Sequence, residues 1–463
     1  MKKIVEIVHD IIRQHVIEGS VCADFTMGQG NDTVFLAQQK ECRKVYAFDI
    51  QPSAYDITTS APPDVVIKLF QSAGYRVVPT GLKHGTVTVL ADKEPVEITT
   101  YRTESGYIHH RKPQEVSFTR SLDEDLKRRD FTMNAIAWHP VHGFHDPFHG
   151  REDIEKKCIR CVGDASLRMK EDALRILRAL RFHCTLQFSL EEATIQAIRT
   201  HAQLLSCISK ERIREEFNRI LLQDYPNTLL LLKDMHVLDE ILKGYTKLMC
   251  RSQNNQWHIY DLLQHTDIAL NHTAGYPLES KLAVIFHDTG KPQCEQIDAD
   301  GISHYYGHAK QSVILGEQWM KELRYDKKTI RTVLQRIAFH DYQLTPRRAV
   351  LRRYLSKFDN DVSQALLAMD VQLADQQAKN PFYAEDGIKT LAACRALLLS
   401  MREEEQLLSL RTLAVNGTDL LACGFQGAQI GSMLKKLLEY AIEDPSRNTR
   451  DQLLAKAKEE KDA

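Results

Sequence analysis

The first 53 residues alternate between helical and extended patterns of apolar positions. An amphipathic helix is predicted near the N-terminus, followed by a strand over residues 21–25, a glycine turn, a second helix and a strand over residues 44–50. This order of elements is the opening of an α/β unit.

The pattern changes twice further along the chain. Residues 56–163 contain short runs rich in Val, Thr and Tyr, with helices between them, which predicts an α+β domain. From residue 166 onwards nearly every segment has helical periodicity, and leucines and arginines each repeat every three residues through residues 174–181.

Composition narrows the class of protein. The chain has 463 residues, a net charge of -1, 43% hydrophobic and 27% charged residues, which is ordinary for a globular protein of about three domains. These values exclude a disordered tail protein and a small disulfide scaffold. Since no run approaches the roughly 18 consecutive apolar residues of a spanning helix, we expect a cytoplasmic protein without a membrane segment.

Two acidic residues lie within strand-like segments. Asp56 is in the run YDITT and Glu97 is in VEITT, so each acid has apolar or β-branched neighbours. Nucleotidyl transfer needs acids on rigid strands, because two metal ions about 3.5–4 Å apart must bridge the triphosphate and the attacking hydroxyl. A carboxylate of an edge strand that faces water would give the same local pattern.

Longer motifs are more specific. The runs RRDFTMNA, DPFHGRED, EDALRILRALRF and ERIREE begin at Arg128, Asp146, Glu171 and Glu211. Over roughly residues 55–463 these motifs resemble the class II CCA-adding enzymes and bacterial poly(A) polymerases of the nucleotidyltransferase superfamily. The resemblance implies an α+β nucleotidyltransferase head, altered at its N-terminus, followed by a mostly α-helical neck, an HD body and a tail. The implied boundaries are 54–164 for the head, 165–235 for the neck that binds RNA and nucleotide, 236–385 for the HD domain and 386–463 for the tail.

The same resemblance implies the partners and the site residues. The partners are tRNA, CTP and ATP, with Mg²⁺ as cofactor. Asp56 would be a catalytic acid that holds Mg²⁺, and Glu97 would activate the tRNA hydroxyl. Asp172 and Arg175 would select the base, since a carboxylate beside a guanidinium on one helix face matches cytosine or adenine. Three further arginines would bind the nucleotide's phosphate and sugar: Arg129, Arg178 and Arg181.

The front of the head departs from the family pattern. The family has a Gly-Gly-x-x-x-Arg-Asp turn and then an Asp-x-Asp strand, but here Ala54 takes the place of the first acid and no such turn precedes it. Loss of a metal ligand commonly costs several kcal/mol of transition-state stabilisation. We therefore expect activity below that of an intact relative.

Residues 1–53 resemble a different family. Asp24, Gly28, Gly30 and Asp49 match the cofactor motif at the N-terminus of class I, S-adenosylmethionine-dependent rRNA methyltransferases. Such a domain needs roughly 150 residues to close its core. We therefore interpret residues 1–53 as a truncated methyltransferase-like segment with a vestigial cofactor site.

A second candidate site lies in the helical region. His265, the adjacent pair His287 and Asp288, and Asp375 resemble the ligands of an HD phosphohydrolase domain, which implies a divalent transition metal. A helical body without metal is the alternative. Three more residues would complete the pocket or form a second metal position: His308, His340 and Asp341.

Three other functions stay open. A poly(A) polymerase shares the motifs of the head. A metal-dependent phosphohydrolase would depend on the HD residues alone. A non-catalytic tRNA-binding protein would keep salt-dependent RNA affinity without turnover.

Overall fold

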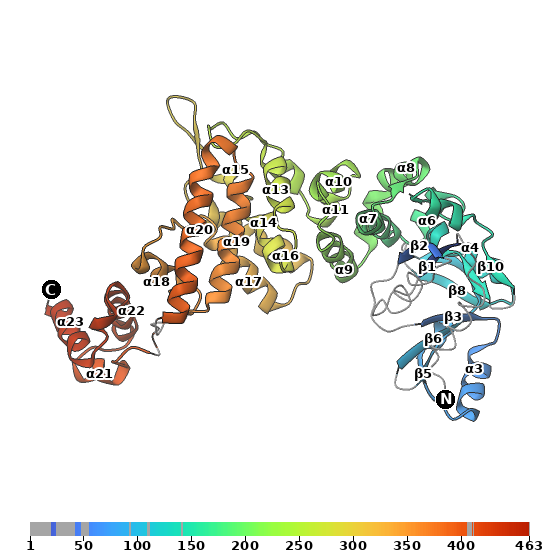
Figure 1. The fold of residues 1–463 in the computed structure, drawn as a ribbon, viewed down its shortest axis with the longest axis horizontal. Helices are drawn as coiled ribbons and strands as arrows, with labels where there is room; N and C mark the ends of the chain where they lie inside the picture. The colour runs from blue at the N-terminus through green and yellow to red at the C-terminus, as the bar shows by residue number, and fades with distance from the viewer. Residues whose placement is uncertain are drawn as a thin grey trace. The chain divides into compact units, whose positions relative to one another are not determined.

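The computed structural model describes residues 20–24, 42–47, 55–91, 94–108, 112–139, 142–404, 410 and 412–462. The chain divides into two compact units, one formed by Met1–Gln223 with Met235–Ile241 and the other by Asp224–Asp234 with Leu242–Ala463 (Figure 1). Within the described ranges, no helix has both the length and the apolar composition of a membrane span.

Two strands precede the head. β1 (Ser20–Asp24) and β2 (Cys42–Ala47) pair in parallel, which confirms the two strands expected in this segment. Residues 48–50, the predicted end of the second strand, lie outside the described residues. The other positions of the methyltransferase-like motif lie outside the described residues: Gly28, Gly30 and Asp49.

The head is built on a four-stranded sheet with the order β3-β6-β5-β4. Its strands are β3 (Tyr55–Thr59), β4 (Arg76–Gly81), β5 (Thr86–Ala91) and β6 (Glu94–Thr100). β3 runs parallel to β6, and the other pairs are antiparallel. Helix α3 (Pro63–Ser72) packs on the sheet, and the core between them consists of Val66, Val87, Val89, Val96 and Ile98.

A hairpin and several short elements complete the head. The hairpin consists of β7 (Arg102–Ile108) and β8 (Lys112–Phe118), and helix α4 (Leu122–Lys127) follows it. Ser121 caps α4 by accepting a hydrogen bond from the Glu124 amide. The short elements are η1 (Leu82–His84), η2 (Thr132–Asn134), β9 (Ala137–His139), β10 (Gly143–His145), α5 (Gly150–Glu155) and β11 (Cys158–Ile159).

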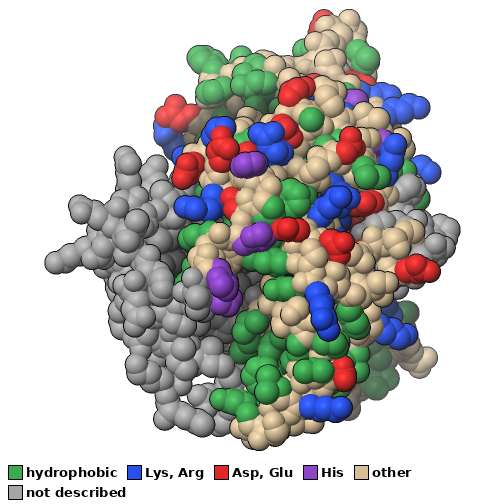
Figure 2. Space-filling view, turned by 90° about the vertical axis from the view of Figure 1, so that its right-hand side faces the viewer, with side chains coloured by type: hydrophobic (Ala, Val, Ile, Leu, Met, Phe, Trp, Pro, Cys, Tyr) green, Lys and Arg blue, Asp and Glu red, His purple; other side chains and the backbone are tan. Residues whose placement is uncertain are grey.

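Charge is mixed on the side of the molecule that Figure 2 shows. Basic and acidic side chains of the described residues lie interspersed there, with apolar side chains among them.

Helices follow the head in the first unit. They are α6 (Ala165–Glu171), α7 (Leu174–Leu186), α8 (Glu192–His201), η3 (Ala202–Cys207), α9 (Lys210–Leu221) and α11 (Leu238–Ile241), with the short strand β12 (Ser189–Leu190) paired to β11. α7 packs against α9 and buries most of its side chains. The expected α+β head followed by a largely helical region is therefore confirmed.

The second unit is helical around α14 (Leu278–Phe286). Every residue of α14 from Ser280 to Phe286 is buried, because α13, α16, α17 and α19 pack around it. The bounds of these four helices are Leu262–Asn271, His308–Glu322, Lys327–Ala338 and Val362–Gln377.

Smaller elements, one long helix and a tail complete this unit. The smaller elements are α10 (Thr228–Asp234), α12 (Tyr245–Met249), α15 (Lys291–Cys294), β13 (Gln296–Ile297), β14 (Ser303–His304) and α18 (Arg348–Ser356). The long helix α20 (Pro381–Glu404) has 24 residues and packs against α19. The tail consists of α21 (Gly417–Ala422), α22 (Ala428–Glu443), η4 (Pro445–Arg447) and α23 (Arg450–Asp462) and has an apolar core of its own.

Candidate functional site

The two predicted catalytic acids occupy neighbouring backbone positions. Asp56 in β3 and Glu97 in β6 are register partners of a parallel pair, and neighbouring strands lie about 4.8 Å apart. Glu97 is exposed, whereas Val96 and Ile98 on either side of it are buried in the head core. The alternation of the strand therefore directs Glu97 away from that core.

Asp130 joins the RRDFTMNA run to helix α7. Its carboxylate accepts hydrogen bonds from Arg178 Nε at 2.7 Å, from Asn134 Nδ2 at 3.0 Å and from the Phe131 amide at 2.9 Å. Burial alone would raise the pKa of Asp130, but Arg178 and Asn134 more than offset this effect and lower it to about 2. The sequence motif contained Asp130, yet its spacing gave no sign of the partner 48 residues away.

The predicted nucleotide-binding arginines have different surroundings. Arg178 is held by Asp130, but its side chain stays 34% exposed. Arg181 is buried in an ion pair with Glu216, with 2.8 Å between Nε and Oε2. Arg129 lies near Asp125, and its Nε is buried without a hydrogen-bond partner among the described residues. Arg178 is therefore better placed than Arg181 to meet a ligand.

The local structure expected for Asp172 is corrected. Asp172 has extended backbone angles, φ −135° and ψ 103°, and separates α6 from α7 instead of lying inside one helix with Arg175. Its Oδ1 accepts from the Leu174 amide at 3.1 Å and its Oδ2 from Arg212 Nη2 at 3.3 Å. The free amides at the start of a helix attract such a carboxylate, which explains the break.

Arg175 of α7 forms hydrogen bonds with α6 and with the segment that follows α4. Its guanidinium donates to Glu171 Oε2 at 2.8 Å and to the carbonyl oxygens of Arg168 and Arg128 at 2.9 Å each. Asp172 and Arg175 are thus bound to other partners in this structure. Base selection by these two residues stays a prediction.

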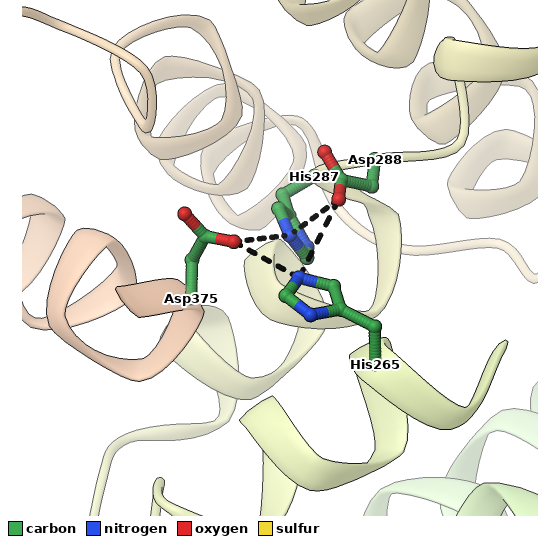
Figure 3. Close-up of side chains that lie close together, drawn as sticks. All are labelled: His265, His287, Asp288 and Asp375. Carbon is green, nitrogen blue, oxygen red and sulfur yellow. Dashed lines mark hydrogen bonds and ion pairs between the residues drawn. The ribbon is translucent and has the colours of Figure 1, made fainter. Parts of the chain in front are cut away.

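The second candidate site gathers four side chains from three helical segments (Figure 3). His265 comes from α13, His287 and Asp288 follow α14, and Asp375 comes from α19. All four are buried, and one potential ligand atom of each lies within 4.8 Å of the others. The structure therefore brings together the complete set of HD residues predicted from the sequence.

The distances in this cluster are short. His265 Nε2 lies 2.9 Å from Asp375 Oδ1 and 3.6 Å from Asp288 Oδ2. His287 Nε2 lies 3.1 Å from Asp288 Oδ2 and 3.5 Å from Asp375 Oδ1. Burial lowers the pKa of His287, but Asp288 and Asp375 more than offset this and raise it to about 10. The cluster thus attracts positive charge strongly.

The donor set fits a divalent metal ion. Imidazole nitrogens and carboxylate oxygens are the usual ligands of zinc, iron and manganese. His287 Nε2 is buried and, among the described residues, has ion-pair contacts with Asp288 and Asp375 but no well-oriented hydrogen bond. Buried polar atoms without a well-oriented hydrogen bond are rare in proteins, and a bound cation would satisfy this nitrogen.

Two lysines that the sequence analysis did not single out border the cluster. Lys291 Nζ lies 2.7 Å from Asp288 Oδ2, and Lys379 Nζ lies 2.7 Å from Asp375 Oδ2. Lys291 is three residues after Asp288, and Lys379 is four residues after Asp375. This spacing places both members of each pair on one side of a helix and could have identified the lysines in the sequence. Of the residues predicted to complete the pocket, His308 and His340 are buried near Asp288, whereas Asp341 is exposed and is not among the potential metal ligands.

Comparisons with known proteins cover the head and part of the helical region. A family model described as the poly A polymerase head domain matches residues 45–160, and one described as a probable RNA- and SrmB-binding site of polymerase A matches residues 187–249.

Named relatives match over a shorter segment. A CCA-adding enzyme of Lactobacillus helveticus is 55% identical over 163 residues, which is 35% of this chain, and one of Bacillus cytotoxicus is 54% identical over 170 residues, or 37%. The chain thus spans 40% and 42% of the length of these two relatives. A crystal structure of the Bacillus stearothermophilus CCA-adding enzyme in complex with CTP aligns with a TM-score of 0.65 and 25% identity, covering 100% of this chain and 98% of that one.

Proposed function

Because the chain carries the head domain and the RNA-binding region of the poly(A) polymerase and CCA-adding enzyme family, we propose that it adds CCA to tRNA 3′ ends from CTP and ATP. The observation that carries this proposal is the alignment of the whole chain with a CCA-adding enzyme, at a TM-score of 0.65 and 25% identity. The stretches of 54–55% identity to CCA-adding enzymes support it.

In this proposal the strand acids carry the chemistry. Asp56 would hold Mg²⁺, which supplies positive charge to the triphosphate when bound. Glu97, at the neighbouring register position, takes the proton of the tRNA 3′-hydroxyl. The hydroxyl oxygen then bonds to the α-phosphorus of CTP or ATP, and the bond to pyrophosphate breaks. Arg178, with its guanidinium fixed at one nitrogen by Asp130, contacts the nucleotide phosphates.

Base selection is the role we propose for Asp172 and Arg175. Asp172 accepts a hydrogen bond from the exocyclic amine of cytosine or adenine, an amine that uracil lacks. Arg175 reaches the base by exchanging its contact with Glu171 for the ring nitrogen or carbonyl. Arg181, buried against Glu216, positions α7 for this task.

We also propose that the rate is low compared with an intact relative. Ala54 stands where the family has the first acid of its metal pair. A single carboxylate holds Mg²⁺ less tightly than two.

The nature of the product tests this function against poly(A) synthesis. tRNAs ending just before the CCA, after the first C and after the second C are incubated with CTP or ATP alone. A CCA-adding enzyme extends the first two with CMP only and the third with a single AMP. Repeated AMP addition without any use of CTP would identify a poly(A) polymerase instead.

A second candidate function belongs to the buried cluster of His265, His287, Asp288 and Asp375. These residues would hold a divalent metal, which lowers the pKa of a bound water and so favours hydrolysis of phosphoesters. Lys291 and Lys379 would bind the phosphate oxygens beside it. Hydrolysis of bis-p-nitrophenyl phosphate should then be lost in His287→Asn and kept in Asp56→Asn.

A further inference from the structure

Exposed aromatic side chains lie on three segments next to the buried His/Asp cluster. Trp257 is in the loop before α13, Phe382 and Tyr383 are in the first turn of α20, and Tyr306 follows β14. Trp257, Phe382 and Tyr306 are 46%, 84% and 72% exposed. We call these four residues the aromatic rim. Single exposed apolar residues are common, but a group of exposed rings on adjoining segments indicates a binding surface.

Asn380 joins the loop of Trp257 to the start of α20. Its amide donates to the Trp257 carbonyl oxygen at 2.9 Å, and its Nδ2 donates to the Gln256 carbonyl oxygen at 3.2 Å. The Phe382 amide donates to Asn380 Oδ1 at 3.2 Å. The Tyr383 ring lies 5.0 Å from the rings of Trp257 and Phe382, at interplanar angles of 62° and 82°. In such edge-to-face pairs, the ring that contributes its edge keeps both faces free of its partner.

The same loop also holds the hairpin of β13 and β14. The Ser303 amide donates to the Asn254 carbonyl oxygen at 2.9 Å. Tyr306 follows this hairpin, and its ring stacks on that of His304, with the centroids 5.7 Å apart and the planes 3° from parallel. Asn254 and Trp257 are three residues apart in the sequence, so the two attachment points are separated by at most about 11 Å. One short segment thus holds both aromatic groups of the rim.

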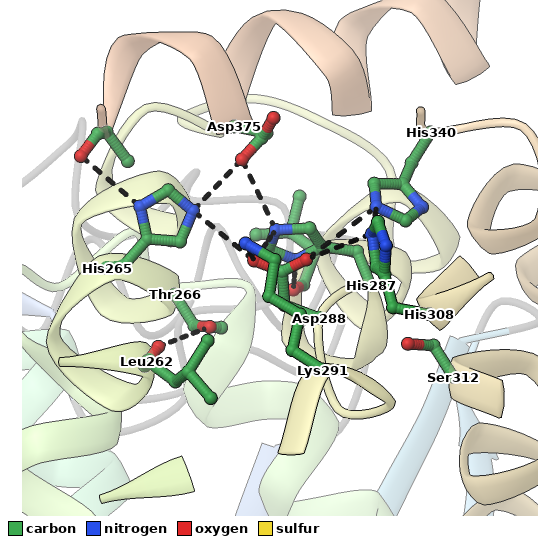
Figure 4. A network of polar contacts seen from close by, with 12 residues as sticks. Leu262, His265, Thr266, His287, Asp288, Lys291, His308, Ser312, His340 and Asp375 are labelled. Carbon is green, nitrogen blue, oxygen red and sulfur yellow. Dashed lines mark hydrogen bonds and ion pairs between the residues drawn. The ribbon is translucent and has the colours of Figure 1, made fainter. Parts of the chain in front are cut away.

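Lys291 connects this segment to the buried His/Asp cluster. Its Nζ donates to Gln253 Oε1 at 3.0 Å and lies 2.7 Å from Asp288 Oδ2. Figure 4 shows Lys291 beside Asp288 within the polar network of the cluster. The ring of His258 lies 3.4 Å from Lys291 at Nε2, and its centroid is 4.8 Å from that of the His265 ring. The loop that carries the tryptophan of the rim therefore adjoins the cluster.

The chemistry of the rim favours the bases of a nucleic-acid strand as its ligand. Any base can stack on an aromatic side chain, since every base has a π-face. Two separate aromatic groups suit successive bases of a strand better than one small ligand. The second candidate function assigns phosphate binding to Lys291 and Lys379, and Lys379 directly precedes Asn380. RNA is the nucleic acid to expect, because residues 187–249 match a model described as a probable RNA-binding site.

We propose that the aromatic rim binds unpaired bases of single-stranded RNA, with Trp257 and Tyr306 as the stacking surfaces of its two groups. The rim belongs to the second unit, whereas the strand acids assigned to CCA addition belong to the first. Stacking on the rim needs neither a metal ion nor hydrolysis. The course of the RNA phosphates past Lys291 and Lys379, in contrast, rests on the second candidate function.

Photo-crosslinking locates the bound bases directly. The full chain is mixed with a fluorescein-labelled uridine hexamer in which 5-iodouridine replaces uridine, with EDTA present so that no metal-dependent reaction occurs. Irradiation and mass spectrometry should then identify crosslinks at Trp257, Tyr383 or Tyr306, because iodouracil reacts with an aromatic ring that it touches. Crosslinks confined to the first unit would overturn the proposal.

The affinity for the uridine hexamer, measured by fluorescence anisotropy in EDTA, tests the role of single rings. Trp257→Ala and Tyr306→Ala should each weaken binding about 5- to 150-fold, as expected for the loss of one stacked base. Trp257→Phe keeps a ring and should bind nearly as well as the unmodified chain. Trp138→Ala, at an exposed tryptophan of β9 in the first unit, is the matched control and should leave the affinity unchanged.

Other occupants of the rim give different results. Unchanged affinity in both alanine variants would overturn the proposal, and so would equally tight binding of a ribose-phosphate hexamer without bases. If the rim were an interface between two copies of the chain, analytical ultracentrifugation would show a dimer that Trp257→Ala dissociates, which would also overturn it. Base-dependent binding in EDTA without hydrolysis of bis-p-nitrophenyl phosphate would support the rim and contradict the hydrolase, so the two can fail separately.

Discussion

Glu216 and Arg181 form a pair of opposite charges that is shielded from water. Their side chains are 8% and 6% exposed, and the two meet between α9 and α7. Burial lowers the pKa of Arg181, and Glu216 counteracts this. Such a pair adds little net stability, but the removal of one partner leaves a buried charge without compensation.

We therefore expect Glu216→Ala to reduce the free energy of unfolding of the first unit by about 3–5 kcal/mol. Urea denaturation followed by circular dichroism measures it. Glu215→Ala, at the exposed neighbouring position, is the matched control and should change stability little. Equal losses of unfolding free energy in the two variants would contradict the cost assigned to an unpaired buried charge.

Asp267 is a buried acid of the second unit. Its Oδ1 accepts from the Leu229 amide at 2.7 Å, and its Oδ2 is buried without a hydrogen-bond partner among the described residues. Burial raises the pKa of Asp267 to about 6, although the amides of Leu229 and Leu230 act in the opposite direction. The folded state thus prefers the protonated acid more than the unfolded state does.

This preference predicts a pH dependence of stability. The stabilisation of the folded state by protonated Asp267 is fully present below the unfolded pKa near 3.8. It is lost as pH rises through the folded pKa of about 6. Asp267→Asn should remove this dependence and raise stability above pH 7 by up to about 3 kcal/mol. Urea denaturation between pH 4.5 and 7.5 tests it, and an unchanged slope in the variant would contradict the assignment.

At the scale of single residues, the sequence predicted the HD cluster better than the nucleotide site. The adjacent His287 and Asp288 are a specific pattern, and the structure places His265 and Asp375 beside them. The partners of the α7 arginines come from distant segments: Asp130 lies 48 residues from Arg178, and Glu216 lies 35 residues from Arg181. No local spacing contains that information.

At the scale of elements, two glycines allow a matched comparison. A Cβ at Gly290 would collide with the backbone of α16, whereas at Gly431, inside α22, it would meet open space. Gly290→Ala should therefore destabilise the second unit by about 1–3 kcal/mol through overpacking. Gly431→Ala should stabilise it by about 0.5–1 kcal/mol, since alanine favours a helix.

Thermal unfolding monitored by circular dichroism measures both substitutions. A Gly290→Ala variant as stable as the unmodified chain would contradict the close packing of this turn.

Periodicity predicted most of the elements but not their boundaries. The alternation around Glu97 gave β6, and the repeats through residues 174–181 gave α7. The break at Asp172 was missed, because the helical pattern continues across it while the carboxylate binds the Leu174 amide. The pairing of β3 with β6 could not be predicted from periodicity either, because the two strands are distant in the sequence.

At the scale of the whole molecule, the two candidate sites lie in different compact units. Asp56 and Glu97 belong to the first, and the buried His/Asp cluster belongs to the second. We expect their chemistries to be separable. Mn²⁺ binding by the buried His/Asp cluster should survive Asp56→Asn, and CMP transfer should survive His287→Asn, as elemental analysis and primer extension would show. Loss of both properties in either variant would contradict this separation.

The most direct test of the account is transfer of labelled CMP and AMP to tRNA that lacks its CCA end, with Mg²⁺. The unmodified chain is compared with Asp56→Asn and Ala54→Asp. We expect slow, ordered incorporation by the unmodified chain, none with Asp56→Asn, and faster incorporation with Ala54→Asp, which restores a second carboxylate. Absence of CMP transfer by both the unmodified chain and Ala54→Asp, or transfer that persists in Asp56→Asn, would contradict it.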